Sequence, residues 1–257
     1  MNNEIVGNIK YNNASINFKG ENNKFICKGN LNLKNCKIRF TGNNSLIYID
    51  ENDYPISLDM RVGNDSVIYF GKDCYVNQKS YLYATERKNI IIGDKLLLSF
   101  ETYFRVVDSH IICDCVTKKR INFSKSILVG DKVWIGQQSL ILKGTVIGSG
   151  AIIGGHSVVA NKTIKSNSLY AGNPAKKIRE NVFCAYHKST NDFSEKEEID
   201  SEVFKNGNEY VYEKDETTTD LKKIDKDLMS LKTVEEKIKY IEKNIVNNNH
   251  KNRFYQE

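Results

Sequence analysis

The residues best suited to acid–base chemistry lie in the segment Asp108-Ser109-His110. An unperturbed imidazole has a pKa of about 6.5, so near pH 7 a neutral histidine can accept a proton from a hydroxyl group. The residues alone leave other roles open, because His110 could make a structural hydrogen bond in a loop. Asp108 either orients the imidazole or ends a strand. Trp134, the only tryptophan, either donates a hydrogen bond from its indole N–H or packs in the core.

Metal chemistry is not expected from this sequence. A catalytic zinc site needs about three protein ligands. Of the four histidines, His187 and His250 lie outside the repeats described next, which leaves His110 and His156. The cysteines form no C-x-x-C pair, and we interpret them as reduced thiols: Cys27, Cys36, Cys74, Cys113, Cys115 and Cys184.

A six-residue repeat predicts the fold that positions these side chains. One aliphatic residue recurs at every sixth position: Val129, Ile135, Ile141, Ile147, Ile153 and Val159. Four positions after each of these, small or β-branched residues recur: Val133, Ser139, Thr145, Ala151, Ser157 and Thr163. This pattern is typical of a β-solenoid in which each hexapeptide forms one strand and one turn. Three hexapeptides make a triangular coil, so Val129 should stack on Ile147 and Ile135 on Ile153.

The repeat extends upstream with interruptions. Six-residue spacing recurs through Phe70, Val76 and Leu82 and again through Ile92, Leu98 and Phe104. Between Phe104 and Val129 the spacing is one residue longer than four repeats, and the stretch contains Asp108, His110 and the basic run 117–120. We therefore expect a loop near 105–128 that projects from the solenoid.

The chain divides into three predicted parts: irregular N-terminal β coils over 1–67, the solenoid over 68–180, and a partly helical appendage over 181–257. Thr233 and Glu236 form a capping-box pattern. Apolar residues near them fall at helical spacing: Leu221, Ile224, Leu228, Leu231, Ile238, Ile241 and Ile245. These helices either dock on the solenoid or bind a partner.

The solenoid residues resemble the hexapeptide-repeat acetyltransferases. The resemblance covers about residues 68–180 and rests on four segments in order: Val129-Gly-Asp-Lys-Val-Trp-Ile-Gly136, Ile141-Leu-Lys-Gly-Thr-Val-Ile-Gly148, Ile153-Gly-Gly-His-Ser-Val-Val159 and Tyr170-Ala-Gly-Asn-Pro-Ala-Lys176. It implies a mainly β chain, a left-handed parallel β-helix, and a homotrimer with active sites between subunits. It also implies that His110 is the general base and that Asp108 and Trp134 lie near it.

The same resemblance implies acetyl-CoA as the acyl donor. Solenoid corners beside glycines are expected to expose backbone N–H groups to the pantetheine arm, and nearby lysines would meet its phosphates. The implied contact residues are Gly136, Gly154, Gly155, Lys162, Gly172, Asn173, Pro174 and Lys176. Each lysine could equally be a solvated surface charge. His156 replaces a small residue in one turn, and we interpret it as a turn substitution.

Charge favours an acidic acceptor. Residues 182–257 hold 13 Lys and Arg against 17 Asp and Glu, a net charge of −4, whereas residues 1–181 have a net charge of +10. A basic body attracts an anionic partner, although scattered surface lysines would give the same sum. We therefore expect a bacterial surface carbohydrate as acceptor, an acidic glycan such as sialic acid or capsular polysaccharide.

Several alternatives stay open or are disfavoured. The acceptor could be another small sugar or a xenobiotic, and a non-catalytic glycan-binding solenoid would need neither His110 nor a cofactor. The β-like start disfavours a serine acetyltransferase, and no Gly-rich nucleotide-binding turn is found. No nucleic-acid-binding motif, signal peptide or apolar run long enough to span a bilayer is found. The expected location is the cytoplasm.

Overall fold

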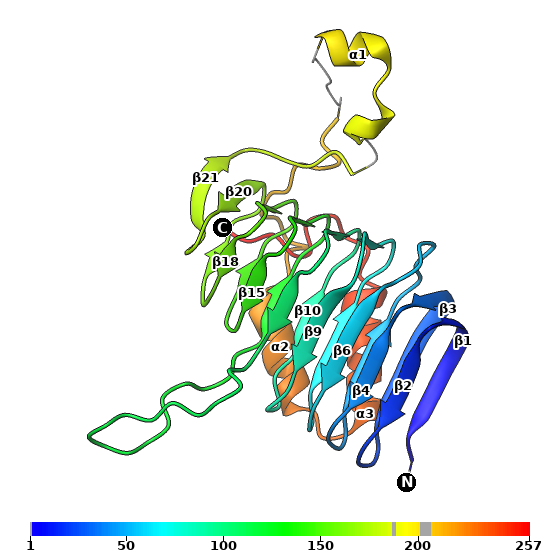
Figure 1. Cartoon of the computed structure of the whole chain (residues 1–257), viewed down its shortest axis with the longest axis vertical. Coiled ribbons are helices and arrows are strands. Elements are labelled where there is room, and N and C mark those ends of the chain that lie inside the picture. The colour runs from blue at the N-terminus through cyan, green and yellow to red at the C-terminus, as the bar shows by residue number, and fades with distance from the viewer. Residues whose placement is uncertain (1, 187–188, 201–206) are drawn as a thin grey trace.

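The computed structural model describes residues 2–186, 189–200 and 207–257, and His187 lies outside them. The described chain is mainly β and winds as a solenoid with three sheets (Figure 1). Sheet A contains β1 (Glu4–Asn12), β3 (Lys24–Lys34), β5 (Leu46–Ile49), β7 (Val67–Phe70), β10 (Ile90–Ile92), β13 (Ile127–Val129), β16 (Val146–Ile147) and β19 (Thr163–Ile164). Sheet B contains β2 (Ser15–Phe18), β4 (Lys37–Phe40), β6 (Leu58–Val62), β9 (Ser80–Ala84), β12 (Tyr103–Arg105), β15 (Leu140–Leu142) and β18 (Val158–Val159). Sheet C contains β8 (Tyr75–Val76), β11 (Leu97–Leu98), β14 (Trp134–Ile135), β17 (Ile152–Ile153), β20 (Ser168–Ala171) and β21 (Lys176–Glu180), whose last pair is antiparallel.

The hexapeptide repeat builds the C-terminal coils as predicted. All six aliphatic residues of the main phase are buried, from Val129 to Val159. The stacking is confirmed, because Val129 pairs with Ile147 and Ile135 pairs with Ile153. Between strands, one turn residue in every six has a positive φ: Lys132, Gln138, Gly144, Gly150 and His156. His156 therefore occupies a regular turn position at φ 55°.

The N-terminal coils over 1–67 continue the same three sheets, with one register shift between Val6 and Asn8 in the pairing of β1 with β3. Strand β5 pairs with β7 across residue 67, and one interior core runs from Phe25 to Ala175. The difference lies in coil length. Residues paired between successive coils are 21 or 22 positions apart in β3, β5, β7 and β10, and 18 apart in β13 and β16. The solenoid is thus continuous from sheet to sheet, with longer early coils.

The predicted loop projects from the solenoid between β12 and β13 (Figure 1). Its arms pair through an isolated antiparallel bridge between Cys113 and Arg120. Its apolar side chains face solvent in this chain: Ile111, Ile112, Val116, Ile121 and Phe123.

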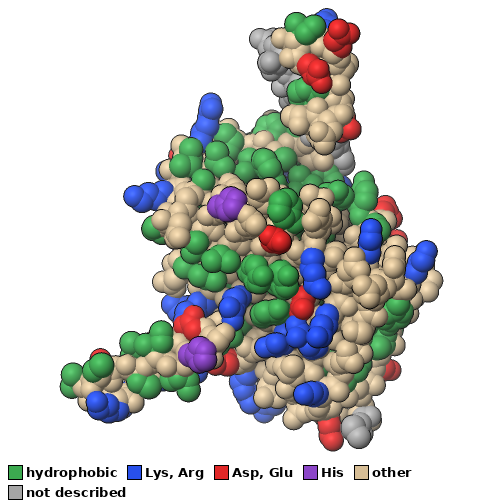
Figure 2. All heavy atoms as spheres, in the orientation of Figure 1, with side chains coloured by type: hydrophobic (Ala, Val, Ile, Leu, Met, Phe, Trp, Pro, Cys, Tyr) green, Lys and Arg blue, Asp and Glu red, His purple; other side chains and the backbone are tan. Residues whose placement is uncertain are grey.

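The outer face of sheet B lies toward the viewer in Figure 1, with helices α2 (Leu221–Ser230) and α3 (Val234–Ile241) on the far side. Figure 2 shows this face, where hydrophobic side chains gather toward the C-terminal coils and basic side chains gather over β4 and β6. Tyr81 stacks on Tyr103 with ring centroids 4.2 Å apart, and Arg61 lies over the ring of Tyr83.

The appendage docks on sheet A. It contains a 3₁₀ helix (Thr190–Asp192), α1 (Glu195–Asp200), α2, α3 and a π-helical turn (Glu242–Val246). The predicted capping box of Thr233 and Glu236 is formed. Apolar residues of α2 and α3 bury outward-facing residues of sheet A: Leu46, Tyr48, Val67, Tyr69, Ile91, Leu128 and Val146.

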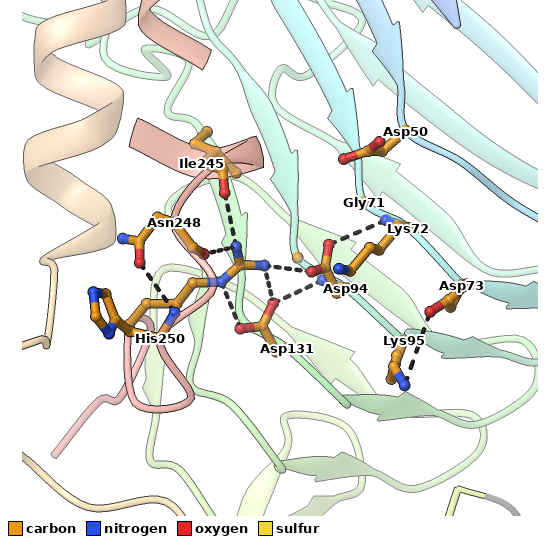
Figure 3. Close-up of polar contacts among 12 residues, drawn as sticks. Asp50, Gly71, Lys72, Asp73, Asp94, Lys95, Asp131, Ile245, Asn248 and His250 are labelled. Carbon is orange, nitrogen blue, oxygen red and sulfur yellow. Dashed lines mark hydrogen bonds and ion pairs between the residues drawn. The ribbon is translucent and has the colours of Figure 1, made fainter. Parts of the chain in front are cut away.

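A buried ion-pair network holds the end of the chain. Arg253 is 2% exposed, and its guanidinium donates two hydrogen bonds to the Asp131 carboxylate, at 2.8 and 2.7 Å (Figure 3). The same guanidinium lies 2.8 Å from a carboxylate oxygen of Asp94 and donates to the carbonyl oxygen of Ile245. The tail is thereby fixed to two successive coils.

Candidate active site

The base of the projecting loop is rigidly held by polar contacts to the coils on either side. Lys143 follows β15 and forms an ion pair with Asp108 at 2.5 Å. Arg120 forms an ion pair with Glu86 on the preceding coil at 2.9 Å. The Lys143 ammonium group, together with Asn122, holds the pKa of Asp108 below its usual value. The loop therefore starts from a fixed position although its tip projects into solvent.

Asn122 ties together the residues around His110. Its side-chain amide donates to a carboxylate oxygen of Asp108 at 2.9 Å and to the carbonyl oxygen of His110 at 2.8 Å. Its side-chain carbonyl oxygen accepts a hydrogen bond from the backbone N–H of Ile112 at 2.9 Å. Asn122 is only 7% exposed, and it holds the backbone directly after the histidine together with the Asp108 carboxylate before it.

The imidazole of His110 is exposed and makes no hydrogen bond or ion pair within the described residues. Asp108 lies close by in sequence, but its carboxylate is directed to Lys143 and Asn122. In this chain Asp108 thus holds the loop rather than the imidazole ring. The ring is left available to a ligand or to a neighbouring molecule.

Trp134 lies on the outer face of sheet C and is 40% exposed. It aligns with Leu97 on one side and Ile152 on the other. The strand that carries it leads directly into Gly136 at the corner between sheets C and B. The indole therefore lies on the surface beside that corner and is not part of the core.

This corner is a stack of residues with almost no side chain. A Cβ atom built on Gly136 would lie 2.5 Å from the nitrogen of Gly155, and one built on Gly154 would lie 2.9 Å from the Cβ of Ala171. Larger residues at Gly136 or Gly154 would clash, so the close stacking of the coils requires glycine there. The result is a smooth backbone edge next to Trp134.

The amide groups of this corner are only partly available. Gly136 donates its N–H to the carbonyl oxygen of Ile153, and Gly154 donates to that of Tyr170, both at 2.8 Å. Coil stacking therefore uses these two N–H groups. The N–H of Gly155 has no hydrogen-bond partner among the described residues.

The remaining predicted cofactor residues lie on the next coil. Lys162 donates from its Nζ atom to the carbonyl oxygen of Ala175 at 2.7 Å, so it braces the turn that contains Asn173 and Pro174. Gly172 has a φ of +100°, where other residues are strained. Lys176 begins β21 and is exposed, with no ion pair among the described residues.

The two halves of the predicted site lie at opposite edges of sheet B. The projecting loop leaves after β12, at the corner that leads to sheet A, whereas the glycine corner lies between sheets C and B. Within one chain, the structure therefore brings Trp134, Gly136, Gly154, Gly155 and Gly172 to one edge and Asp108 and His110 to the other.

Sequence reasoning missed Asn122 and Lys143, which position the loop. Neither belongs to a motif with His110, and both reach Asp108 only through the fold. The position of Lys143 could have predicted its contact with Asp108. Lys143 follows Ile141 and Leu142, which pair with Phe104 and Arg105, so the turn after β15 stacks on the start of the loop.

The described residues offer neither a metal-binding cluster nor a membrane-spanning helix. They contain no group of three His, Cys, Asp or Glu side chains that could hold a metal ion. None of their helices is long and apolar enough to cross a membrane.

Comparison with known proteins gives matches to one kind of transferase. The bacterial transferase hexapeptide family (six repeats) matches residues 126–161. A polysialic acid O-acetyltransferase of Neisseria meningitidis is 37% identical, over 63% of this chain and 75% of its own. A polysialic acid O-acetyltransferase of Escherichia coli O1:K1 / APEC is 31% identical, over 66% of this chain and 62% of its own, so this chain spans less than two thirds of that relative.

A solved structure supports the same assignment. The crystal structure of the polysialic-acid-specific acetyltransferase NeuO superposes with a TM-score of 0.55 and 28% identity, covering 71% of this chain and 91% of NeuO. Together with the parallel sheets and the confirmed hexapeptide stacking, these matches identify the fold as the left-handed parallel β-helix. The chain belongs to the hexapeptide-repeat O-acetyltransferase family, which includes these polysialic acid O-acetyltransferases.

Proposed function

We propose that this protein transfers the acetyl group of acetyl-CoA to a hydroxyl group of an acidic, sialic-acid-containing glycan. The observation that carries the proposal is the 37% identity to a polysialic acid O-acetyltransferase, three quarters of whose length is matched. The net charge of +10 on residues 1–181 supports an anionic acceptor. The reaction is placed in the cytoplasm because cells hold acetyl-CoA there.

The proposed base is His110, because its imidazole is exposed on a loop in which Asn122 holds the His110 carbonyl and the Ile112 N–H. The imidazole takes the proton of the acceptor hydroxyl as the oxygen attacks the thioester carbonyl carbon. The tetrahedral intermediate then expels the coenzyme A thiolate, which recovers the proton from the imidazolium ion. A positioned general base contributes about 10²- to 10⁴-fold in rate.

The proposed donor site is the glycine corner beside Trp134. Its backbone edge leaves room for the thin pantetheine arm, and the unpartnered N–H of Gly155 is a hydrogen-bond donor for it. Gly172, Asn173 and Pro174 would line the far end, where exposed Lys176 suits the phosphates. Lys162 acts by holding that turn, through its bond to Ala175.

We infer that the working unit is a homotrimer in which one subunit supplies His110 and its neighbour the glycine corner. Within a single chain these groups lie at opposite edges of sheet B, so a neighbouring subunit is needed to bring a donor corner to the histidine. The apolar side chains on the projecting loop, such as Ile111 and Val116, also need a partner surface, since large exposed apolar patches are unusual on monomers.

The activity is tested by mixing the purified protein with acetyl-CoA and either polysialic acid or neutral oligosaccharides, while following thiol release and product mass. We expect acetyl groups on polysialic acid. Transfer to neutral sugars alone would overturn the acidic acceptor. If the protein neither transferred acetyl groups nor bound acetyl-CoA, a non-catalytic glycan-binding role would replace this proposal.

The shared site is tested by mixing two inactive variants. His110→Ala removes the base, and Gly155→Trp blocks the donor corner. If each site uses two chains, unfolding and refolding the mixture should restore up to about a quarter of the activity, as expected for random assembly around shared sites. A mixture as inactive as the separate variants, with mixed trimers demonstrated by native mass spectrometry, would place the whole site in one chain.

A further inference from the structure

A large groove lies outside the candidate active site. It has a volume of about 1010 Å³ and runs along the N-terminal coils, between residues 11 and 79. It follows the corner that leads into β2, β4, β6 and β9 of sheet B. The hexapeptide match at 126–161 does not reach it, and neither His110 nor the glycine corner lines it.

The charged side chains that line the groove are all positive. Three lysines line it, Lys34, Lys37 and Lys79, and among the described residues that line it there is no Asp or Glu. Each of these ammonium groups lacks an ion pair or hydrogen bond within the described residues. A cleft lined by one sign of charge concentrates ions of the opposite sign. The groove is therefore suited to an anion with several spaced charges.

The groove also carries exposed aromatic rings. Tyr11, Tyr54 and Tyr75 are 48%, 50% and 40% exposed. Tyr54 meets Tyr75 edge to face, with ring centroids 5.4 Å apart, so ring faces stay open to solvent. Aromatic rings offer large, stiff apolar surfaces against which the C–H faces of sugar rings pack. Lysines and open tyrosines in one groove fit a chain of acidic sugars better than an isolated phosphate or carboxylate.

A line of basic side chains connects this groove to the loop that carries His110. Lys37 begins β4, and Arg39 faces the same side two residues later. Arg39 pairs in register with Arg61, which pairs with Tyr83, which pairs with Arg105. Strands in a sheet are about 4.8 Å apart, so this ladder spans roughly 14 Å.

Two members of the ladder, Arg61 and Arg105, form no ion pair with another described residue. Arg39 forms an ion pair with Asp59. Arg61, in contrast, lies over the Tyr83 ring at 5.2 Å from its centroid, and Arg105 donates to the hydroxyl of Ser109 at 2.6 Å. Neither has an ion pair among the described residues. The positive surface therefore continues from the groove to the residue that precedes His110.

We propose that the groove holds the acidic glycan at sugar units several positions away from the one that is acetylated. The assignment of this role rests on the proposed function, whereas binding of a polyanionic glycan by the groove does not. Long acceptors would reach both the groove and the loop, and short ones only the loop. The groove thereby makes the enzyme selective for polymer over short oligosaccharide.

The test compares two triple variants that remove the same charge. The groove variant is Lys34→Gln, Lys37→Gln and Lys79→Gln. The control is Lys226→Gln, Lys239→Gln and Lys243→Gln, three exposed lysines of the docked tail that have no ion pair in the described residues. Binding of polysialic acid and of a sialic acid dimer is measured by titration calorimetry without acetyl-CoA. Acetyl transfer to the same two acceptors is measured in parallel.

We expect the groove variant to bind the polymer roughly tenfold more weakly and to raise its KM similarly, since three exposed charge contacts are each modest. The control should change polymer binding by less than about twofold. The kcat value and the KM for the dimer should stay constant in both. Tyr54→Ser should weaken polymer binding in a way that high salt does not remove, because this contact is not ionic.

Equal polymer binding by the groove and control variants would overturn the groove while leaving the proposed transfer intact. Lysine-dependent polymer binding by a wild-type protein that acetylates no glycan would retain the groove and overturn the proposed function. A change of subunit number confined to the groove variant, seen by analytical ultracentrifugation, would assign the lysines to a contact between copies and overturn their role in glycan binding.

Discussion

His110 is distinguished from other surface histidines by the fixed backbone around it and the unpartnered ring. Replacing it with alanine should leave the fold intact, because the side chain is exposed and supports no contact in the described residues. The kcat value should fall by about 10²- to 10⁴-fold, the usual contribution of a general base. Steady-state kinetics and circular dichroism check this together. Retention of most of the activity in a folded variant would remove His110 from the mechanism.

Asn122 shows how a positioning residue differs from the base itself. Asn122→Ala removes the two donor bonds to Asp108 and to the carbonyl of His110. We expect kcat to fall by roughly tenfold with little change in the KM for acetyl-CoA, because the donor corner is not touched. The pH at which activity is half-maximal should also move, since the ring loses its fixed surroundings. A fall in the melting temperature without a change in kcat would show a purely structural role.

At the scale of the elements, the docked tail depends on one buried cation. Arg253→Ala leaves the carboxylates of Asp94 and Asp131 buried without their partner. Breaking a buried ion pair from one side typically costs about 3–5 kcal/mol. Thermal unfolding should show a large loss, and Arg253→Lys should recover only part of it, because an ammonium group cannot form the two parallel bonds to Asp131. Lys251→Ala, an exposed neighbour, is the control and should be neutral.

The same network predicts an unusual dependence of stability on pH. Burial, together with the nearby charge of Asp131, raises the pKa of Asp94 to about 6, against the opposing effect of Arg253. An unfolded aspartate has a pKa of about 3.9, so between these values the folded state holds the extra proton. The contribution of Asp94 is thus present in full below about pH 4 and is lost as pH rises through 6, by at most about 1.4 kcal/mol per pH unit.

Urea unfolding at several pH values, compared between wild type and Asp94→Asn, isolates this contribution from those of the other carboxylates. The wild type should lose stability relative to the variant between pH 4 and pH 6 and run parallel to it above that range. Parallel curves throughout would mean that Asp94 stays ionised and that Arg253 outweighs burial.

Over the whole molecule, the repeat pattern of the sequence predicts the stacking of the coils. It does not predict the contacts that form between residues far apart in the chain. The stacking of Val129 on Ile147 could be predicted because every hexapeptide carries an aliphatic residue at the same position. The stacking of the N-terminal coils leaves a weaker signal in the sequence, because a period of 21 or 22 residues is not a multiple of six. The hydrogen bond of the Gly136 N–H goes to Ile153 on the adjacent coil, and Arg253 binds Asp131, which lies 122 positions earlier. Neither contact can be predicted from the residues next to it in the sequence.

The uneven distribution of charge over the molecule predicts that the KM for an anionic acceptor depends on ionic strength. The solenoid and its loop carry a net charge of +10, whereas residues 182–257 carry −4. An anionic acceptor that is attracted by this surface loses that attraction as salt shortens the screening length, from about 10 Å at 0.1 M to about 3 Å at 1 M. The KM for polysialic acid should therefore rise steeply with sodium chloride while kcat stays nearly constant. Sucrose at equal osmolarity should leave both unchanged, and a KM independent of salt would show that the acceptor is recognised without the basic face of sheet B.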